Sequence, residues 1–506
     1  MGIVLGLDVG TSGTKAVAMD ANGKLLASAL VEYPLHSPKP NWAEQDPADW
    51  KRAAFEALAS LASKIDTSSV RGIGLTGQMH GSVFLDAENR VLRNALLWCD
   101  QRTAKQCEDI TAKVGEQRLI EMVCNPALTG FTAPKILWLR DNEPAIYERV
   151  RKVLLPKDYI RLELTGEFAT DVADASGTLL FDVKKRCWHN ELCGILGIDV
   201  DLLPKSFEGP EVTGVLSRDA AAKTGLPAGI PVVAGGGDQA ANGVGCGIVR
   251  KGVVSASLGT SGVVFAHADR IAMDPAGRVH TFCHAVPGKW HIMGVMLSAG
   301  GALRWFRDNL CAEEVAASKL AGNDPYEIIT AAAENIPLGA EGLTFLPYLT
   351  GERTPHKDPD AKGAFIGLSL RHTKAHLARA VMEGVAFGMR DSCEIIRGMG
   401  VGVNEVRCSG GGARSSLWRH IMADVCDAPM VTINVDEGPA YGAAILAGVG
   451  GGLYSHVEQA CTHIVQEVSR IEQTPEHVPQ YSRWFREYQA AYTALAPGFK
   501  RTAALL

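Results

Sequence analysis

The chain has 506 residues, enough for two large domains that each bury a core of their own. With 46% hydrophobic and 21% charged residues it has the composition of a soluble globular protein, and a net charge of -6 gives no support to nucleic-acid binding. No apolar stretch approaches the ~20 residues of a membrane span, and the sequence starts in a predicted strand without a signal peptide. Twelve cysteines lie scattered without CxxC pairs, so we expect reduced thiols and a cytoplasmic protein with no nucleic-acid or membrane partner.

The first predicted elements are two strands, residues 3–9 and 16–19, joined by a turn rich in glycine and hydroxyl residues. Such a turn offers hydroxyl groups, closely spaced backbone amides and a lysine, the groups that hold phosphate. Here they come from Gly10, Thr11, Ser12, Thr14 and Lys15. Asp8 lies at the strand end and would face the phosphate. Because a carboxylate beside phosphate is unfavourable unless a cation separates them, the pattern predicts Mg²⁺ at Asp8. An ordinary surface hairpin is the alternative for this segment alone.

Local patterns predict several further elements in both halves. Residues 23–29 are expected to form a third strand, and a helix begins near Asp46 with Pro47 in its first position. Residues 130–139 predict an amphipathic helix. Residues 376–389 predict another helix with one apolar face.

A strand at residues 70–75 contains a misleading motif. Gly72, Gly74 and Gly77 match the dinucleotide pattern GxGxxG, which requires glycines that follow a strand and open a helix. Here the glycines lie within the strand, and another apolar run follows. No GxxxxGK[ST] loop occurs in the sequence either. Dinucleotide binding and P-loop chemistry are therefore excluded.

Gln78, Met79 and His80 follow that strand directly. A strand end seldom presents an amide, a thioether and an imidazole in succession. The pattern indicates a small site for a polar substrate at the strand terminus. A turn with a hydrogen-bonded core histidine is the alternative.

The sharpest local signal is a buried strand at residues 230–234 followed by three glycines and then Asp238 and Gln239. Three glycines permit a ligand to approach the backbone closely. Asp238 then opens a helix of small residues, whose N-terminus favours the anionic carboxylate. An N-cap is the alternative for any aspartate at a helix start. A cap does not require three preceding glycines, so we predict a catalytic role for Asp238.

The first turn has a second copy half a chain away, at residues 257–265, with Thr260 in its Gly-Thr-Ser-Gly tip. A repeat of such long period implies a duplicated domain. Ser257 stands where the first copy has Asp8, so the halves are not equivalent. Two such turns facing across a cleft could clamp a polyphosphate, and only one would bring a metal-linked carboxylate.

Glycines also punctuate the second half. Gly410, Gly411 and Gly412 lie between a predicted strand at residues 406–409 and a helix, an arrangement suited to a flat or phosphorylated ligand. A helix of small residues starts at residues 438–444. We expect it to pack closely beneath the glycine turn.

Two longer stretches carry a family resemblance. Residues 130–142, with Lys135 and Trp138 in place, fit one signature of the FGGY family of carbohydrate kinases, and residues 367–384 resemble the other. The resemblance covers nearly the whole chain. It implies an α/β fold of two actin-like, RNase H-like domains, the hexokinase–actin ATPase fold, around a central cleft. We expect a sugar-binding domain with the catalytic aspartate over residues 1–246 and an ATP-binding domain with the C-terminal helices over residues 247–506.

For the site, the resemblance implies Asp238 as general base, Asp8 near Mg²⁺, and ATP on the second domain. The residues expected on the sugar are Gln78, Met79, His80, Asp238 and Gln239. The residues expected on the nucleotide are Gly10, Thr11, Ser12, Thr14 and Lys15 of the first turn, and Thr260, Gly300, Gly301, Gly411, Gly412 and Ser416 of the second domain.

The resemblance also bears on the substrate. Met79 and His80 stand where glycerol-phosphorylating members carry an Arg–Glu pair, which argues against glycerol. Together with residues 235–239 they look most like the members that phosphorylate D-xylulose, which implies ATP-dependent phosphorylation at O5 in xylose metabolism. Another ketose or a pentitol (D-ribulose, ribitol, arabinitol) is the alternative. A non-catalytic sugar sensor is a second alternative. The presence of both Asp8 and Asp238 argues against it, because a chain without activity should have lost one of them. The expected partners are the sugar and ATP, and a homodimer is left open.

Overall fold

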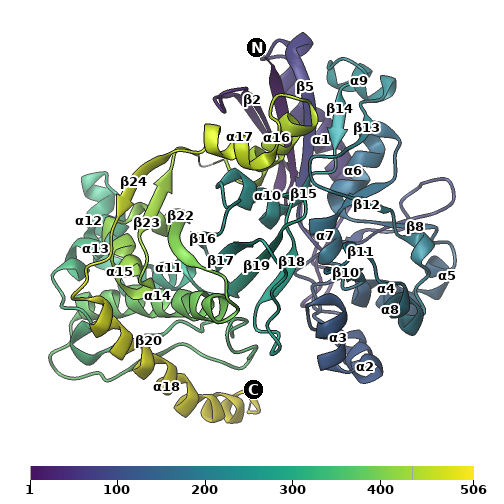
Figure 1. The fold of residues 1–506 in the computed structure, drawn as a ribbon. Helices are drawn as coiled ribbons and strands as arrows, with labels where there is room; N and C mark the ends of the chain where they lie inside the picture. Colours follow the sequence, from purple (N-terminus) through teal and green to yellow (C-terminus); the bar gives the residue numbers. More distant parts are fainter. Residues whose placement is uncertain (1, 436, 506) are drawn as a thin grey trace.

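The computed structural model describes residues 2–435 and 437–505 and is an α/β protein of two lobes. Figure 1 shows the purple-to-blue first half on one side and the green-to-yellow second half on the other, with α10 (Asp238–Gly245) and α16 (Pro439–Gly450) between them. Each lobe is built on one seven-stranded sheet. The predicted two-domain actin-like fold is confirmed. Among the described helices, none is long and apolar enough to cross a membrane.

The first sheet has the order β13-β14-β5-β1-β2-β3, and the short β15 pairs with β5. β1 pairs antiparallel with β2 and parallel with β5, so the turn after β1 and the end of β5 lie at the same edge of the sheet. The strand bounds are β1 (Ile3–Val9), β2 (Gly13–Asp20), β3 (Leu25–Glu32), β5 (Val70–Gly77), β13 (Val212–Val215), β14 (Pro231–Val233) and β15 (Gly236–Gly237).

The second sheet repeats this arrangement. Its order is β18-β19-β17-β16-β22-β23-β24, and β16 pairs antiparallel with β17 and parallel with β22, as β1 does with β2 and β5. The run β19-β17-β16-β22-β23 therefore matches β3-β2-β1-β5-β14, the repeat expected from a duplicated domain. The bounds are β16 (Gly252–Leu258), β17 (Gly262–Ala268), β18 (His280–Cys283), β19 (Trp290–Met296), β22 (Val403–Ser409), β23 (Met430–Ile433) and β24 (Glu467–Ile471).

Short strands outside the two sheets pair in twos. They are β4 (Glu44–Gln45) with β7 (Ala95–Leu96), β6 (Val83–Leu85) with β8 (Lys152–Leu154), β9 (Ala169–Asp171) with β12 (Lys205–Phe207), β10 (Phe181–Asp182) with β11 (Cys187–Trp188), and β20 (Thr344–Leu346) with β21 (Ala364–Ile366).

Helices cover both sheets. In the first lobe they are α1 (Pro47–Ala62), α2 (Ala104–Val114), α3 (Glu116–Val123), α4 (Thr132–Asn142), α5 (Pro144–Tyr147), α6 (Pro156–Thr165), α7 (Val172–Ser176), α8 (Asn190–Leu196), α9 (Arg218–Thr224) and α10. In the second half they are α11 (Gly300–Leu310), α12 (Ala312–Ala321), α13 (Pro325–Glu334), α14 (Lys374–Gly398), α15 (Ser416–Cys426), α16, α17 (Val457–Ile464) and α18 (Val478–Ala503).

Three helices predicted from the sequence can be compared with the structure. α1 begins at Pro47 after an Asp46 cap, as predicted. α14 is longer than predicted at both ends: it begins two residues early, at Lys374, because Thr373 and His376 form a capping box, and it continues to Gly398. The prediction that residues 130–139 form an amphipathic helix is wrong: in α4 all of residues 132–139 are buried. That helix is enclosed by its own lobe and has no solvent face over most of its length.

The position of α16 also differs from the prediction. It contacts β1 and β5 of the first sheet and α10, and it does not lie beneath the glycine turn of the second lobe. Figure 1 shows this yellow-green helix beside the purple strands. A Cβ on Gly6 or Gly74 would lie 1.8 Å or 1.9 Å from a carbonyl oxygen of α16, and one on Gly72 would lie at 2.8 Å. Two of the three glycines of the misleading GxGxxG pattern, Gly72 and Gly74, thus serve the packing of α16, and Gly77 lies against Val9 of β1.

Candidate active site

The turn between β1 and β2 is held beside the end of β5 by side chains. Gln78, the residue after β5, donates through its amide to the Gly10 carbonyl (3.2 Å) and to Gln45 (2.9 Å). It accepts a bond from the Thr11 hydroxyl (3.2 Å), and Trp98 also donates to Thr11 (3.0 Å). Both amide hydrogens of Gln78 are therefore engaged, and this residue fixes the turn. Its contact with the sugar stays a prediction.

The other turn residues divide between the tip and the interior. Ser12 is exposed at the tip, whereas Thr14 is fully buried and its hydroxyl donates to Tyr33 (3.4 Å). Neighbours on a strand point to opposite faces, so Lys15 lies on the face away from Thr14. Its ammonium group pairs with Glu437 of the second half (2.6 Å). Thr14 therefore belongs to the core, and Lys15 bridges the two halves of the chain.

Asp8 lies near the end of β1, directly opposite Lys15 in the β1–β2 register. Its Oδ1 is fully buried and has no hydrogen-bond partner among the described residues. Burial and, second, the charge of Asp238 raise the pKa of Asp8 to about 7, and Lys15 opposes this rise. The two carboxylates therefore lie close enough to influence each other, and a buried unpartnered oxygen of this kind fits a cation ligand.

Asp238 follows the glycine turn after β14 and opens α10, as predicted. Gly235 has a φ of 79°, and a Cβ there would lie 1.7 Å from the Leu75 carbonyl oxygen, so only glycine fits. The Asp238 Oδ1 accepts a bond from the Gln239 amide (2.7 Å). Burial raises the pKa of Asp238 to about 6, and the bonds from Gln239 oppose this rise. At pH 7 the carboxylate is therefore mostly ionised, and its pKa lies near the working pH, as efficient general-base catalysis requires.

His80 is oriented by a carbonyl group from α7's end. Its Nδ1 lies 2.7 Å from the Gly177 oxygen, which can only accept, so Nδ1 carries the hydrogen. Burial and, second, the charge of Lys135 lower the pKa of His80 to about 3, so the ring is neutral. Its Nε2 is then an acceptor, and it makes no hydrogen bond within the described chain. Met79 beside it is buried, and a Cβ on Gly237 would lie only 2.8 Å from the Met79 Cγ.

Aromatic residues that the sequence did not single out surround His80. The ring centroid of Phe131 lies 4.8 Å from that of His80, and Phe282 lies at 6.3 Å. Phe131 precedes α4 within the family signature, which is a signal that could have found it. Phe282 stands on β18 of the second sheet in a stretch with no motif. The surroundings of His80 are therefore lined from both lobes.

A cavity of about 470 Å³ opens in the second lobe, a size suited to a small-molecule ligand. Four residues predicted for the nucleotide line it: Thr260, Gly300, Gly411 and Gly412. Residues that the sequence did not single out also line it, among them Arg304, Tyr326, Ser415 and Trp418. Gly301 and Ser416 are not among the lining residues. Ser416 is exposed, and Gly301 donates its amide to the Thr260 carbonyl (3.0 Å).

The second turn is fixed to the start of α11. The Thr260 carbonyl accepts from the amides of Ala299 (2.9 Å) and Gly301 (3.0 Å). A Cβ on Gly300 would lie 2.6 Å from the Gly259 oxygen. Turn and helix start can approach this closely only because both consist of glycine and small residues, and together they form one wall of the cavity.

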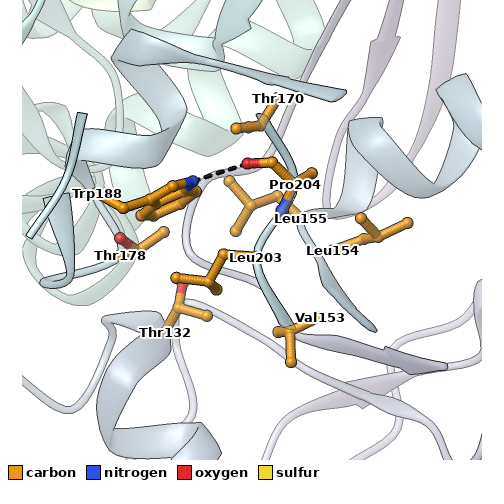
Figure 2. A pocket seen from close by; sticks show the side chains of 9 residues that line it. All are labelled: Thr132, Val153, Leu154, Leu155, Thr170, Thr178, Trp188, Leu203 and Pro204. Atoms are coloured by element: carbon orange, nitrogen blue, oxygen red, sulfur yellow. Dashed lines mark hydrogen bonds between the residues drawn. The ribbon is translucent and has the colours of Figure 1, made fainter. Parts of the chain in front are cut away.

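A second cavity lies behind α4, where Figure 2 shows the Trp188 indole donating to the Pro204 carbonyl (2.7 Å). Its lining is mostly apolar and consists of Thr132, Val153, Leu154, Leu155, Thr170, Thr178, Trp188, Leu203 and Pro204. With a volume of about 10 Å³ it holds at most one water. It is a packing gap beside α4, too small for a ligand larger than water.

Both sheets have the same strand order, and each carries a glycine-rich turn after a central strand. With the two half-buried carboxylates Asp8 and Asp238 at the edge of the first sheet, they define a two-domain phosphotransferase of the actin-like fold. Comparison with known proteins identifies the family within this class of phosphotransferases. Residues 3–245 match the N-terminal domain and residues 254–451 the C-terminal domain of the FGGY family of carbohydrate kinases. The chain belongs to this family, and as a kinase it takes ATP as the phosphoryl donor.

Individual relatives cover almost the full length. A xylulose kinase from Escherichia coli (strain K12) is 41% identical over 498 residues, covering 98% of each chain. A xylulose kinase from Bacillus subtilis (strain 168) is 38% identical over 495 residues, covering 97% of each. The solved structure of xylulose kinase from Rhodospirillum rubrum is 32% identical with a TM-score of 0.92, covering 98% of this chain and 100% of that one.

Proposed function

We propose that the chain transfers the γ-phosphoryl group of ATP to O5 of D-xylulose, with Asp238 as the general base. The observation that carries this proposal is the convergence of two groups of residues at one edge of the first sheet. One is the carboxylate pair Asp8 and Asp238, and the other is Met79 with a neutral His80. The similarity to xylulose kinases over nearly the full chain supports the choice of sugar.

The sugar contacts follow from the chemistry of a ketopentose, which presents an apolar C–H face beside several hydroxyl groups. A thioether suits the C–H face, and the unengaged Nε2 of His80 accepts a hydrogen bond from a hydroxyl. Glycerol is too short to reach both Met79 and His80 while its terminal hydroxyl lies at Asp238. A sugar phosphate is disfavoured because its charge would lie near two carboxylates.

In the transfer step, Asp238 accepts the proton of the O5 hydroxyl as that oxygen attacks the γ-phosphorus, a role worth about 10²–10⁴-fold in rate. Phosphoryl transfer needs an aligned nucleophile and shielded charge more than covalent help. We infer that the nucleotide occupies the 470 Å³ cavity and reaches toward the amides of the β1–β2 turn.

The residues present fit a magnesium ion. The unpartnered buried Oδ1 of Asp8 is a hard oxygen donor, and Mg²⁺ is typically held by one or two carboxylates plus substrate phosphates and water. We infer that Asp8 holds the ion, which when bound shields the charge of the phosphates. Lys15, opposite Asp8 in the register, brings a cation to the same edge, where its ammonium group is paired with Glu437.

An ADP-release assay over a panel of sugars tests the proposal. We expect D-xylulose to give the highest kcat/KM, with D-ribulose, ribitol and arabinitol weaker and glycerol weakest. If D-ribulose or glycerol gives a higher kcat/KM, the xylulose assignment fails while the kinase assignment stands. Absence of ADP release with every sugar in the panel would favour a non-catalytic sensor.

We expect His80→Ala to raise KM for D-xylulose about tenfold and to weaken the preference over pentitols, because a site built to bond a hydroxyl discriminates by leaving polar groups unpaired. Steady-state kinetics with D-xylulose and arabinitol measure both effects. His36→Ala removes an exposed imidazole that makes no side-chain hydrogen bond within the described chain, and it serves as the control. An unchanged KM in His80→Ala would remove this residue from the sugar site.

Two turns on separate lobes can grip one triphosphate only if the lobes approach each other. We therefore expect D-xylulose together with a non-hydrolysable ATP analogue to lower the radius of gyration in solution scattering. The sugar alone and the analogue alone are the controls. An unchanged scattering profile at saturating concentrations of both ligands would contradict the two-sided clamp.

A further inference from the structure

Five charged residues with no catalytic assignment form one buried cluster behind the sugar region, which we call the buried ion cluster: Lys157, Asp158, Arg161, Asp171 and Asp174. All five are 0% exposed. The Lys157 ammonium lies 2.5 Å from Asp158, 2.7 Å from Asp171 and 3.4 Å from Asp174, and Arg161 lies 3.8 Å from Asp158. Buried ion pairs are weak sources of stability because their desolvation is costly. A cluster of five therefore calls for another explanation.

The guanidinium group of Arg161 holds the chain that leads to the general base. Its two terminal nitrogens donate to the carbonyls of Val233 (2.8 Å) and Ala234 (2.5 Å). Val233 ends β14, and Ala234 follows it directly before the glycine turn. Gly236 and Gly237 pair with β5 as β15, so the place of Asp238 depends on that pairing and on how the chain enters the turn just before it. Arg161 fixes that entry.

The other end of the cluster holds the residue that orients His80. Asp171 accepts from the amides of Ala173 (2.8 Å) and Asp174 (2.9 Å), and so caps α7, while its second oxygen faces Lys157. α7 leads directly to Gly177, whose carbonyl accepts from the His80 Nδ1. A Cβ on Gly177 would lie 2.6 Å from the His80 ring, so there is no room for a larger residue at this position.

The charges of the cluster nearly balance. Three carboxyl groups face two cations, and neither carboxyl oxygen of Asp174 has a hydrogen-bond partner among the described residues. Burial raises the pKa of Asp174 well above its ordinary value, with Lys157 opposing. Three carboxyl groups and two cations leave at most one excess negative charge, so the cluster can hold backbone groups in place with little net charge beside Asp238.

We propose that Arg161 and Asp171 are positioning residues of the buried ion cluster: Arg161 sets the general base through the β14 carbonyls, and Asp171 sets His80 through α7 and Gly177. The inference rests on the proposed function, in which Asp238 takes the proton and His80 contacts the sugar. Under this proposal the two ends of the buried ion cluster affect different kinetic parameters, kcat at one end and KM for the sugar at the other. Arg161 governs turnover, and Asp171 governs sugar binding.

The first test is Arg161→Lys, which keeps a cation but replaces the planar guanidinium fork, whose two terminal nitrogens each reach a separate carbonyl, by a single ammonium nitrogen. We expect kcat for the best sugar of the panel to fall at least about tenfold, because small misplacement of a reacting group is costly, while KM for ATP stays within about twofold. Arg379→Lys is the matched control. Arg379 is a buried arginine of α14 in the second lobe, bonded to Glu383 and Tyr481 (2.7 Å each). It should lower the melting temperature with kcat within about twofold.

The second test is Asp171→Asn, which keeps an acceptor for the α7 cap but removes the charge facing Lys157. We expect KM for the sugar to rise at least about threefold with a smaller change in kcat. This variant decides the matter if Arg161→Lys does not fold. The proposal is overturned if Arg161→Lys keeps kcat within twofold, if Arg379→Lys loses as much kcat, or if Asp171→Asn leaves KM unchanged. A wild type inactive on D-xylulose refutes only the proposed substrate, since the best sugar of the panel then serves the same tests.

Discussion

Asp238→Asn is expected to lower kcat at least ~10²-fold, because the amide keeps the shape of the carboxylate but cannot accept the O5 proton. Sugar binding should change far less. Glycines on one side and α10 on the other still hold the residue in place, and an amide can still bond a hydroxyl. A coupled ADP-release assay gives kcat, and calorimetric titration with the sugar alone gives its affinity.

The pH dependence provides an internal control for Asp238. Its pKa of about 6 means that wild-type kcat/KM should fall as the pH drops through 6, since protonation removes the base. The Asn variant should lose the part of this limb that reports Asp238, whereas the titration of Asp8, whose pKa burial raises to about 7, is present in the wild type and should remain in the variant. Asp219→Asn, on the exposed face of α9, should keep both the rate and the limb. A variant at position 238 that retains more than about a tenth of wild-type kcat would exclude the base role.

Asp8→Ala is expected to lower kcat on the order of 10²-fold, because the transferred phosphoryl group loses the residue that we propose as its cation ligand. Raising the Mg²⁺ concentration should restore part of the lost activity, since weaker metal binding can be offset by mass action. Titrating Mg²⁺ at fixed ATP and sugar measures this recovery.

Sugar binding in the absence of nucleotide should survive the Asp8→Ala change, and calorimetric titration provides that control. Asp8 would lie on the wrong side of the cleft if sugar binding were lost while the affinities for ATP and Mg²⁺ stayed intact. Removal of its charge also relieves the repulsion between the carboxylates of Asp8 and Asp238, so the folded protein should not be destabilised through this pair.

How much of the site could be predicted from the sequence depends on the distance between partners along the chain. Asp238 could be predicted because the three glycines, the buried strand and the helix start are all neighbours, and the close contact of Gly235 with Leu75 explains why glycine is needed there. The two-domain fold could be predicted from the repeated Gly-Thr-Ser-Gly turn. The two strands that flank the turn pair antiparallel in each sheet, β1 with β2 and β16 with β17.

Longer-range relations could not be predicted. The carbonyl that fixes the His80 tautomer belongs to Gly177, and nothing in the sequence around His80 indicates that partner. The sequence predicts that the Gln78 amide contacts the substrate, whereas in the structure the amide donates to Gly10 and Gln45 and holds the β1–β2 turn. Ser416 was one residue away from the cavity lining, where Ser415 stands, because helix phase decides which side chain faces inward.

Because α16 covers β1 and β5, the first strands to be synthesised cannot be enclosed until almost the whole chain has left the ribosome. Gly6 and Gly74 emerge early, and the helix that packs against them ends at Gly450. Nascent chains usually complete N-terminal domains first, and contacts this distant in sequence form slowly. In this protein the first lobe must instead wait, with one face of its central strands open, for a helix translated near the end.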